Sequence, residues 1–314
     1  MSTRSPVSTG ISLNDSAPYA EAANELRSVR DVLRFGVGRM VEAGISFGHG
    51  TRNALDEAAY LTAHALHLNS EQLDSFLDAR LTHRERASVL KLFERRIDQR
   101  IPAAYLTGEA WLGDYRFRVD ARVIVPRSTL AELIRDGLSP WISDATSVKA
   151  ALDLCTGSAC LAILLAETFP HAQVDAVELS GDALAVAALN VQDYQLEQRV
   201  KLVHGDLLSA VPAKRYDLIV SNPPYVNAQA MAALPPEFRR EPEMALAGGM
   251  DGLDLVRKIL ESARAHLNEG GVLVVEIGHN REAIEQAYPR LPFRWLNTSA
   301  GADLVFLLER ENLP

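Results

Sequence analysis

The chain has 314 residues, of which 47% are hydrophobic and 23% charged, and its formal net charge at pH 7 is -9. This composition is typical of a globular protein with one sizeable domain and a smaller one, and the acidic balance argues against tight unaided binding to nucleic acid and favours a basic protein partner. The apolar runs are too short for a membrane span, and the start "MSTRSPVSTG" lacks the apolar core of a secretion signal, so we expect a cytoplasmic protein with no membrane association.

The first part of the chain predicts a short lead-in and a helical domain. Residues 1–20 are rich in Ser, Thr, Pro and Asn and poor in periodic apolar residues, which favours disorder. From residue 21 to 100, apolar residues recur at three- and four-residue intervals, a spacing typical of amphipathic helices. The stretches that show it best are residues 25–44, 55–68 and 83–100.

Two histidines in the second of these stretches have a spacing that could suit a metal. His64 and His67 lie about one helical turn apart, and Glu57 lies about two turns before them. Structural zinc usually takes four ligands, and no others are near in sequence, so we predict no metal site. The cysteines, Cys155 and Cys160, are too few for a metal site, and a disulfide is not expected in a reducing compartment.

Residues 101–129 change from helical to alternating spacing. Apolar and polar residues alternate in "YRFRVD" (115–120) and in "RVIV" (122–125). Alternation with period two is the pattern of a half-buried strand, so we predict a β-hairpin with its turn at Asp120 and Ala121. We interpret this segment as a linker between two domains.

From residue 130 to 314 the pattern is that of an α/β protein. Near-continuous apolar runs alternate with helical stretches, as expected for parallel strands covered on both faces. The last two runs, "FRWLNTSA" and "ADLVFLLER", are joined by a short turn with a glycine and predict an antiparallel pair. The fold class is therefore a doubly wound sheet whose last strand is antiparallel. The five runs expected to be parallel are "VKAALDLC", "QVDAVEL", "VKLVHG", "YDLIVS" and "GGVLVVEIG".

The segment after the first of these strands has features of a ligand-binding turn. In such sheets, ligands collect at the carboxyl ends of the strands. Gly157 allows a ligand to approach the backbone closely, and a helix starting near Ser158 offers free N–H groups to an anionic group. An ordinary strand-to-helix turn explains the segment about as well. The residues singled out here are Asp153, Thr156, Gly157, Ser158 and Ala159.

The next three strand ends also carry polar side chains. Glu178, followed by Leu179, stands where an acidic group can accept hydrogen bonds from both hydroxyls of a ribose. Asp206, followed by Leu207, can accept from an adenine amino group, although a helix N-cap or turn Asp is the structural alternative. Asn222 follows the fourth strand. Four such strand ends in succession predict a nucleoside site.

These motifs resemble a known family. "DLCTGSACLAI", "AVELS", "GDLL", "NPPY" and the antiparallel end strand are similar to those of the class I S-adenosylmethionine-dependent methyltransferases, over about residues 130–314. Asn-Pro-Pro-Tyr narrows the resemblance to enzymes that methylate an amino group on a planar carbon. The order of the helical domain, the hairpin, "VPRS", "NPPYV" and "EPEMALAGGMDGL" looks like the protein-glutamine methyltransferases. "VPRST" is more similar to the ribosomal-protein branch than to the release-factor branch, which has Pro-Arg-Pro-Asp-Thr-Glu there.

The resemblance implies a substrate, a cofactor and a set of site residues. The substrate is a glutamine of large-subunit ribosomal protein L-three, free or in ribosomal precursor particles, and residues 21–100 take part in its recognition. The cofactor is S-adenosylmethionine, and no metal is implied. The implied catalytic residues are Asn222, Pro223, Pro224 and Tyr225. The implied cofactor-binding residues are Asp153, Thr156, Gly157, Ser158, Ala159, Glu178, Leu179, Asp206, Leu207 and Asn222.

The proposed chemistry explains the choice of residues after the fourth strand. The Asn222 side-chain oxygen and the Pro223 carbonyl are expected to accept one N–H each from the acceptor amide, while Tyr225 packs on its flat face. Prolines lack the N–H that a central strand needs, so Pro223 and Pro224 must follow the strand end.

Three positions depart from the family pattern or leave a role open. Ala159 stands where the family usually has Gly, which would introduce about 1 kcal/mol of strain if φ is positive there. Leu207 stands where the release-factor branch often has an aromatic residue. Arg127 is expected either to reach the active site or to anchor the hairpin.

Three other functions remain open from the sequence. The same chemistry would serve methylation of peptide release factors. A DNA adenine methyltransferase shares the Asn-Pro-Pro-Tyr logic, but the net charge and the lack of a basic recognition domain argue against it. A non-catalytic scaffold that binds ribosomal precursors is the third.

Overall fold

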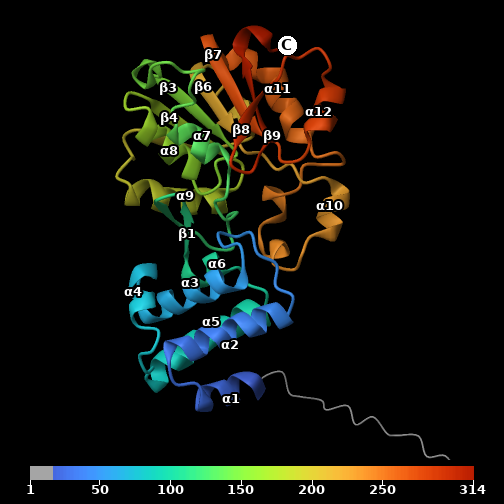
Figure 1. The fold of residues 1–314 in the computed structure, drawn as a ribbon. Coiled ribbons are helices and arrows are strands. Elements are labelled where there is room, and N and C mark those ends of the chain that lie inside the picture. Colours follow the sequence, from blue (N-terminus) through green and yellow to red (C-terminus); the bar gives the residue numbers. More distant parts are fainter. Residues whose placement is uncertain (1–16) are drawn as a thin grey trace, which may run out of the picture. The chain divides into compact units, whose positions relative to one another are not determined.

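The computed structural model describes residues 17–314, which form two compact units (Figure 1). The first unit contains the described residues up to Phe47 and Thr51–Ile101, and the second contains Gly48–Gly50 and Pro102–Pro314. In the part of the chain that the structure describes, no helix is long and apolar enough to cross a membrane.

The predicted lead-in falls mostly outside the described residues, which exclude residues 1–16. Within it, the prediction of disorder is wrong for residues 17–20, which begin helix α1. The physical reason is Tyr19, whose buried ring packs edge-on against the ring of Phe35.

The first unit is a bundle of helices, as the periodicity predicts. Ser28 and Thr82 begin two of them with reciprocal capping hydrogen bonds. Gly36 leaves room for the Phe93 ring, because a Cβ at that position would lie 2.6 Å from it. The helices are α1 (Ala17–Glu25), α2 (Val29–Glu42), α3 (Ala54–Leu66), α4 (Ser70–Ser75) and α5 (His83–Ile97).

An ion pair is buried in this unit. Arg96 Nε donates to Glu57 Oε1 at 2.5 Å, and both side chains are fully buried. Glu57 also accepts from the Thr51 hydroxyl, so it is engaged in the core rather than beside His64 and His67. Among residues 17–314, no group of three or more His, Cys, Asp or Glu side chains is arranged to hold a metal ion.

The β-hairpin lies earlier in the chain than predicted, because the predicted first strand is its second strand. After α6 (Ala103–Thr107), strand β1 (Glu109–Leu112) pairs with β2 (Tyr115–Arg118), so residues 115–118 form the second strand, and 122–125 form none. Gly113 occupies the first position of the two-residue turn with φ +62°, which suits a hairpin turn. The predicted pairing of residues 115–120 with 122–125 is therefore wrong.

The second unit is built on a seven-stranded sheet with the order β5-β4-β3-β6-β7-β9-β8. Its first five strands are parallel to one another, and β9 runs antiparallel to both of its neighbours, β7 and β8, which confirms the predicted fold class. The strand order reverses between β3 and β6, and such a reversal opens a crevice at the carboxyl ends. The strands are β3 (Ala150–Leu154), β4 (Gln173–Glu178), β5 (Val200–His204), β6 (Tyr216–Ser221), β7 (Leu267–Glu276), β8 (Arg294–Thr298) and β9 (Gly301–Glu309).

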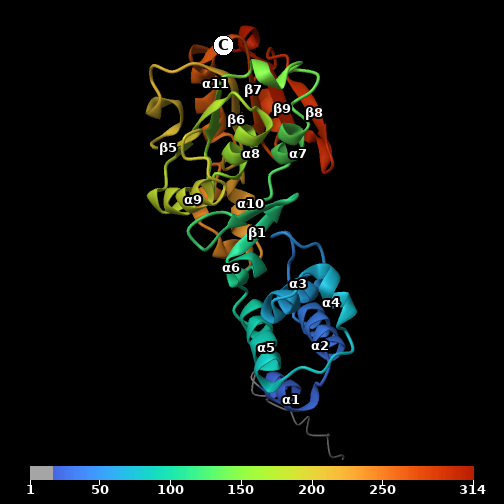
Figure 2. The same ribbon diagram turned by 90° about the vertical axis from the view of Figure 1, so that its left-hand side faces the viewer.

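Helices cover both faces of this sheet (Figures 1 and 2). Successive strand residues point to opposite faces, so Ala151 packs with one helical layer and Leu152 with the other. One layer contains α7 (Leu130–Arg135), α8 (Cys160–Thr168) and α9 (Gly181–Asp193). The other contains α11 (Asp254–His266) and α12 (Arg281–Ala287). The short helix α10 (Ala228–Ala233) follows β6.

Candidate active site

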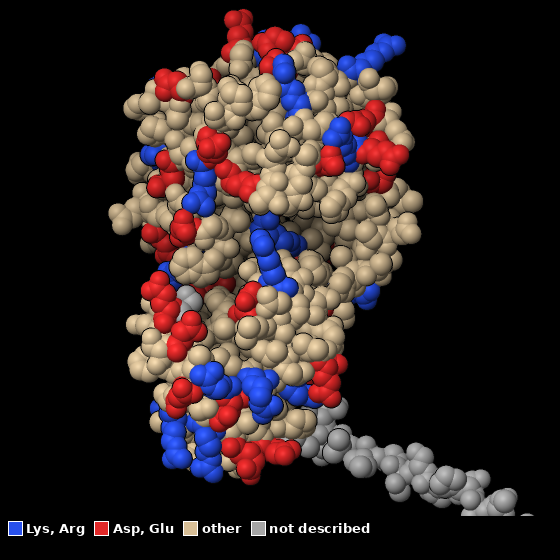
Figure 3. Space-filling view, in the orientation of Figure 1, with Lys and Arg blue, Asp and Glu red and all other residues tan. Residues whose placement is uncertain are grey.

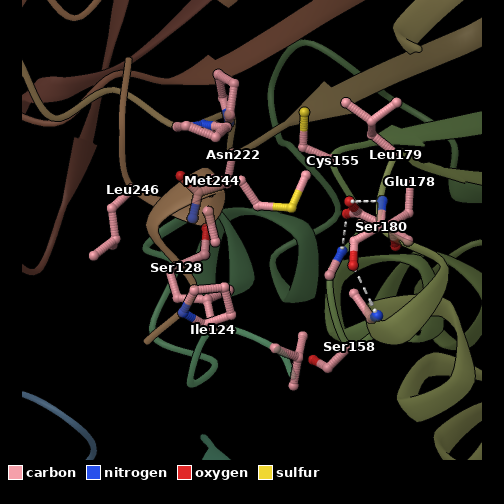
Figure 4. A pocket seen from close by; sticks show the side chains of 18 of the residues that line it. Ile124, Ser128, Cys155, Ser158, Glu178, Leu179, Ser180, Asn222, Met244 and Leu246 are labelled. Carbon is pink, nitrogen blue, oxygen red and sulfur yellow. Dashed lines mark hydrogen bonds between the residues drawn. The ribbon is translucent and has the colours of Figure 1, made fainter. Parts of the chain in front are cut away.

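A cavity of about 310 Å³ lies at the carboxyl ends of β3 to β6 in the second unit. In Figure 4, Glu178 and Ser180 stand on one side, Asn222 and Leu246 on the other, and Met244 extends between them. Most of the predicted site residues line this cavity. They are Thr156, Gly157, Ser158, Glu178, Leu179, Asp206, Leu207, Asn222, Pro223, Pro224 and Tyr225.

Asp153 and Ala159 are fully buried beneath the turn and do not belong to the residues that line the cavity. The Thr156 hydroxyl donates to Asp153 Oδ2 at 2.5 Å, which links the buried carboxyl to the lining. Burial raises the pKa of Asp153 to about 7, although the Thr156 hydrogen bond opposes this shift.

The backbone at and beneath the cavity wall adopts left-handed conformations that residues with side chains disfavour. Ala159 has φ +63° at the N-cap of α8, so the condition for strain stated from the sequence is met. Cys155 and Leu207, which line the cavity, have φ values of +60° and +49°. Each such residue introduces roughly 1–2 kcal/mol of strain, and strain of this kind gathers at functional sites.

The Glu178 carboxylate is oriented by two backbone groups at the cavity wall. Gly157 N–H donates to one of its oxygens and Ser180 N–H to the other, both at 2.9 Å. Each carboxylate oxygen has a second lone pair, so the group can still accept hydrogen bonds from a ligand.

Asp206 lies at the end of β5, and its side chain is half exposed. It occupies the N-cap position of a short 3-10 helix, but its side chain makes no capping hydrogen bond, so capping does not account for the residue. Leu207 beside it is buried, whereas Leu179 on the neighbouring strand end is half exposed.

Asn222 directly follows β6, which ends at Ser221, as the two prolines predicted. Among the described residues, the Asn222 amide has no hydrogen-bonding partner, so its oxygen and nitrogen are available to a ligand. The Ser221 hydroxyl donates to Leu154 O at 2.9 Å and ties the end of β6 to β3.

Tyr225 is enclosed by backbone. Asn280 Nδ2 donates to Tyr225 O at 2.8 Å. Side chains at three glycines would collide with the tyrosine, because a Cβ at Gly248, Gly252 or Gly278 would lie 2.3–2.7 Å from its atoms. Two of these glycines belong to the "EPEMALAGGMDGL" segment, whose composition is explained by this close approach.

Glu276 joins the "VPRST" segment to Tyr225. Its Oε2 accepts from the Ser128 hydroxyl at 2.6 Å and from Thr129 N–H at 2.9 Å, while the Tyr225 hydroxyl donates to Oε1 at 3.3 Å. Burial, and then the Glu276 charge, raise the pKa of Tyr225 well above its ordinary value, so its hydroxyl keeps its proton at neutral pH.

A second buried carboxylate holds Arg127. Glu241 accepts two hydrogen bonds from its guanidinium, at 2.5 and 2.7 Å, and one from Val125 N–H at 3.0 Å. Burial alone would raise the pKa of Glu241, but His49 and Arg127 hold it at about 2. Arg127 lines the cavity, and its hydrogen bonds go to Val125 and Glu241 rather than to the β1–β2 hairpin, so of the two roles considered from the sequence the structure favours the one at the site.

Comparison with known proteins identifies the family. The "Methyltransferase small domain" model matches residues 141–249, and the "PrmC N-terminal domain" model matches residues 46–108. The ribosomal protein uL3 glutamine methyltransferase of Bordetella pertussis is 56% identical over 289 residues, covering 92% of this chain and 97% of that protein. The protein of that name from Neisseria gonorrhoeae is 56% identical over 295 residues, covering 94% and 98%.

This chain belongs to the ribosomal protein uL3 glutamine methyltransferase family. The resemblance inferred from the motifs is thereby confirmed. The family uses S-adenosylmethionine as methyl donor. The cavity offers groups that suit this cofactor: Gly157, with positive φ, leaves the backbone open to a ligand, and the carboxylates of Glu178 and Asp206 can accept hydrogen bonds.

Sequence reasoning missed several residues that lie behind the lining of this methyltransferase site and hold its side chains. Glu276 ends a buried strand as Glu178 does, so the strand-end argument applied to β7 would have predicted it. Glu241 and His49 carry no such signal, because they lie in loops and meet Arg127 and Phe238 through the tertiary fold.

Proposed function

We propose that this enzyme transfers a methyl group from S-adenosylmethionine to the side-chain amide nitrogen of a glutamine in ribosomal protein uL3. The observation that carries the proposal is the presence of Asn222 and Pro223 in one cavity with Glu178 and Asp206. Asn222 and Pro223 can bind the acceptor amide, and the two carboxylates can bind the nucleoside of the cofactor, so the cavity can hold both reactants of this methyl transfer. The names of relatives that match over more than 90% of the chain support uL3 as the protein.

The cofactor is assigned to one wall of the cavity, which we call the cofactor wall: residues 156–158, Glu178, Leu179, Asp206 and Leu207. Glu178 accepts from the ribose hydroxyls, Asp206 from the adenine amino group, and Leu207 packs on the base. Asp153 and Ala159 support this wall from beneath, through Thr156 and the start of α8. When bound, the sulfonium supplies an electrophilic methyl group.

The acceptor amide is assigned to the opposite wall, the acceptor wall: residues 222–225 with Arg127 and Phe238. The Asn222 side-chain oxygen and the Pro223 carbonyl each accept one amide N–H, and they stabilise the positive charge that develops on nitrogen. As the N–C bond forms, the sulfur–carbon bond breaks and leaves a neutral thioether. The surplus N–H proton then passes to water.

Tyr225 does not act as a general base in this scheme. Its hydroxyl keeps its proton and donates it to Glu276, and a neutral phenol is too weak a base to take a second proton at neutral pH. Its contribution is to pack against the flat amide and to fix the backbone after Pro224.

Residues 21–100 are proposed to take part in recognising the protein substrate, in the cytoplasm, either on free uL3 or on ribosomal precursor particles. Tight direct binding to DNA is not part of the proposal. On the face shown in Figure 3, basic and acidic side chains are interspersed rather than gathered into one basic patch.

The test uses uL3 purified from cells that lack the enzyme. Incubation with labelled S-adenosylmethionine should label uL3, and mass spectrometry should find one added methyl group on a glutamine. Peptide release factor and duplex DNA with adenines serve as competing substrates. Faster methylation of either competitor, or no labelling of uL3 by enzyme that binds the cofactor, would overturn the proposal.

A further inference from the structure

A histidine in the second unit has no role in the function described above. His49 is 3% exposed, and neither of its ring nitrogens has a hydrogen-bonding partner among the described residues. Its Nε2 lies 3.4 Å from Glu241 Oε2, a contact that is ionic only when the imidazole is protonated. A buried polar group without a hydrogen bond is destabilising by about 1–3 kcal/mol, so an apolar residue would serve packing better at this position.

The local sequence is suited to presenting this side chain. His49 stands between Gly48 and Gly50, whose φ values are +130° and +110°, and residues with side chains rarely adopt such values. These three residues cluster with the second unit, although the flanking chain clusters with the first. A Cβ at Gly48 would lie 3.2 Å from the Phe238 ring. The Gly-His-Gly segment is therefore part of the second unit and packs closely on Phe238 there.

His49 contacts Phe238 and Glu241, and both of these residues contact Arg127 at the cavity wall. Its ring lies against the Phe238 ring, with centroids 4.3 Å apart. The Arg127 guanidinium lies over the same phenylalanine at 5.5 Å and is held by Glu241, whose side chain is fully buried. Phe238 and Arg127 line the cavity, whereas His49 and Glu241 stand behind them.

Arg127 retains donors for a ligand. Its contacts with Glu241 and with Val125 O use part of the five N–H groups of a guanidinium, and its side chain is 26% exposed. Because Glu241 balances its charge, the remaining donors suit neutral carbonyl oxygens such as those of a peptide. The Phe238 ring beside it suits an apolar side chain.

We propose that His49 is a positioning residue for the protein substrate: through Glu241 and Phe238 it fixes Arg127 to receive the peptide that flanks the acceptor glutamine. This inference rests on the proposed function, since it names how that same site takes its protein substrate. The acceptor side is favoured over the cofactor side because Phe238 and Glu241 belong to the segment after Asn222–Tyr225. Arg127 is also close enough to lower the pKa of Tyr225, against the larger effect of burial.

The experiment measures kcat and KM with uL3, and cofactor affinity by calorimetry, for His49→Ala and His49→Gln. His49→Ala should raise KM for uL3 at least tenfold, with kcat and cofactor Kd within twofold of the wild type. His49→Gln should recover most of this loss, because its side-chain N–H can donate to Glu241. His266→Gln is the matched control, since Nε2 of this histidine also lacks a partner and His266 lies outside the cavity lining.

A double-mutant cycle makes the test specific. If His49 acts through Arg127, then His49→Ala should change KM little in the Arg127→Ala background. Additive effects, an equal rise in cofactor Kd, or an unchanged KM would overturn the inference. If His49→Ala does not fold, the same cycle is run with His49→Leu, which keeps apolar packing on Phe238. Failure of the wild type to methylate uL3 would instead count against the proposed function.

Discussion

The hydrogen bonds within the cofactor wall join residues that are close in sequence, whereas those within the acceptor wall join residues that are far apart in sequence. On the cofactor wall, Glu178 is oriented by Gly157, which lies 21 positions away, and by Ser180, which lies two positions away. On the acceptor wall, Ser128 donates to Glu276 across 148 positions, and Arg127 donates to Glu241 across 114. The first wall is a set of strand ends, and the second is a network that depends on the whole second unit.

This difference has a consequence for function. If the proposed assignment holds, side chains of the cofactor wall meet their ligand almost independently, so single changes there should weaken cofactor binding and leave the rest of the site intact. Side chains of the acceptor wall share buried carboxylates, so a change in one should affect its neighbours. Substitutions on the two walls should therefore differ in their effects on cofactor affinity, kcat and stability.

Asn222→Ala should reduce kcat by a factor of about 10²–10³, the range seen when one preorganised polar contact to the transition state is removed. Cofactor affinity should remain within about fivefold, because Glu178 and Asp206 are unchanged. Rates with uL3 and calorimetry with S-adenosylmethionine measure the two effects. Undiminished methylation by a variant that still binds cofactor would contradict the assigned role of Asn222.

Glu178→Ala should have the opposite profile. Loss of a carboxylate that holds Gly157 N–H and accepts from a ribose should weaken cofactor binding about 10- to 100-fold. At saturating cofactor, kcat should fall much less. Titration calorimetry gives the affinity, and Glu178→Gln, which keeps one acceptor oxygen, should lie between the wild type and Ala. A variant that binds cofactor normally would remove Glu178 from the cofactor wall.

Glu276→Gln should disturb the acceptor wall as a unit. Its carboxylate accepts from Ser128, Thr129 and Tyr225, and an amide nitrogen in place of one oxygen would face a donor. We expect a loss of about 1–3 kcal/mol in the free energy of unfolding and a lower kcat, with cofactor affinity retained. Urea unfolding checks the first. Glu285→Gln, at an exposed carboxylate, is the control and should be near neutral.

Asp153→Asn should change how stability depends on pH. Burial raises the pKa of Asp153 from 3.8 to about 7, so the wild type loses stability as pH rises from about 4 through 7. Asn cannot ionise, so the variant does not lose this stability. The difference in free energy of unfolding, variant minus wild type, should therefore increase between about pH 4 and 7 and stay constant above pH 7. Urea unfolding at several pH values between 4 and 8 measures this. Parallel curves would mean that Asp153 ionises at its ordinary pKa.

Ala159→Gly should have the smallest effect and should stabilise the protein. Glycine adopts φ +63° without strain, so we expect a gain of up to about 1 kcal/mol in the free energy of unfolding. Ala162→Gly, in the interior of the same helix, is the matched control and should destabilise by about 1 kcal/mol. A loss of stability in Ala159→Gly would show that its buried methyl group matters more than the strain.

Much of the fold was predictable because its signals are local. Near-continuous apolar runs predicted five parallel strands, and their ends located the carboxylates of the cofactor wall. The hairpin was misplaced because residues 122–125 contain three successive β-branched residues, which favour strands. In the structure, the backbone there bonds to a distant side chain, since Val125 N–H donates to Glu241.

By itself, the sequence determined which polar residues follow each strand and that β6 ends before Pro223. Both follow from local causes, because side-chain periodicity and the missing proline N–H act within a few residues. The tertiary structure alone decided that Glu276 and Glu241 would orient Tyr225 and Arg127, and that His49 would stand behind them. Buried carboxylates require hydrogen-bond donors, and the donors available to these two come from chain segments that meet only after the sheet has formed.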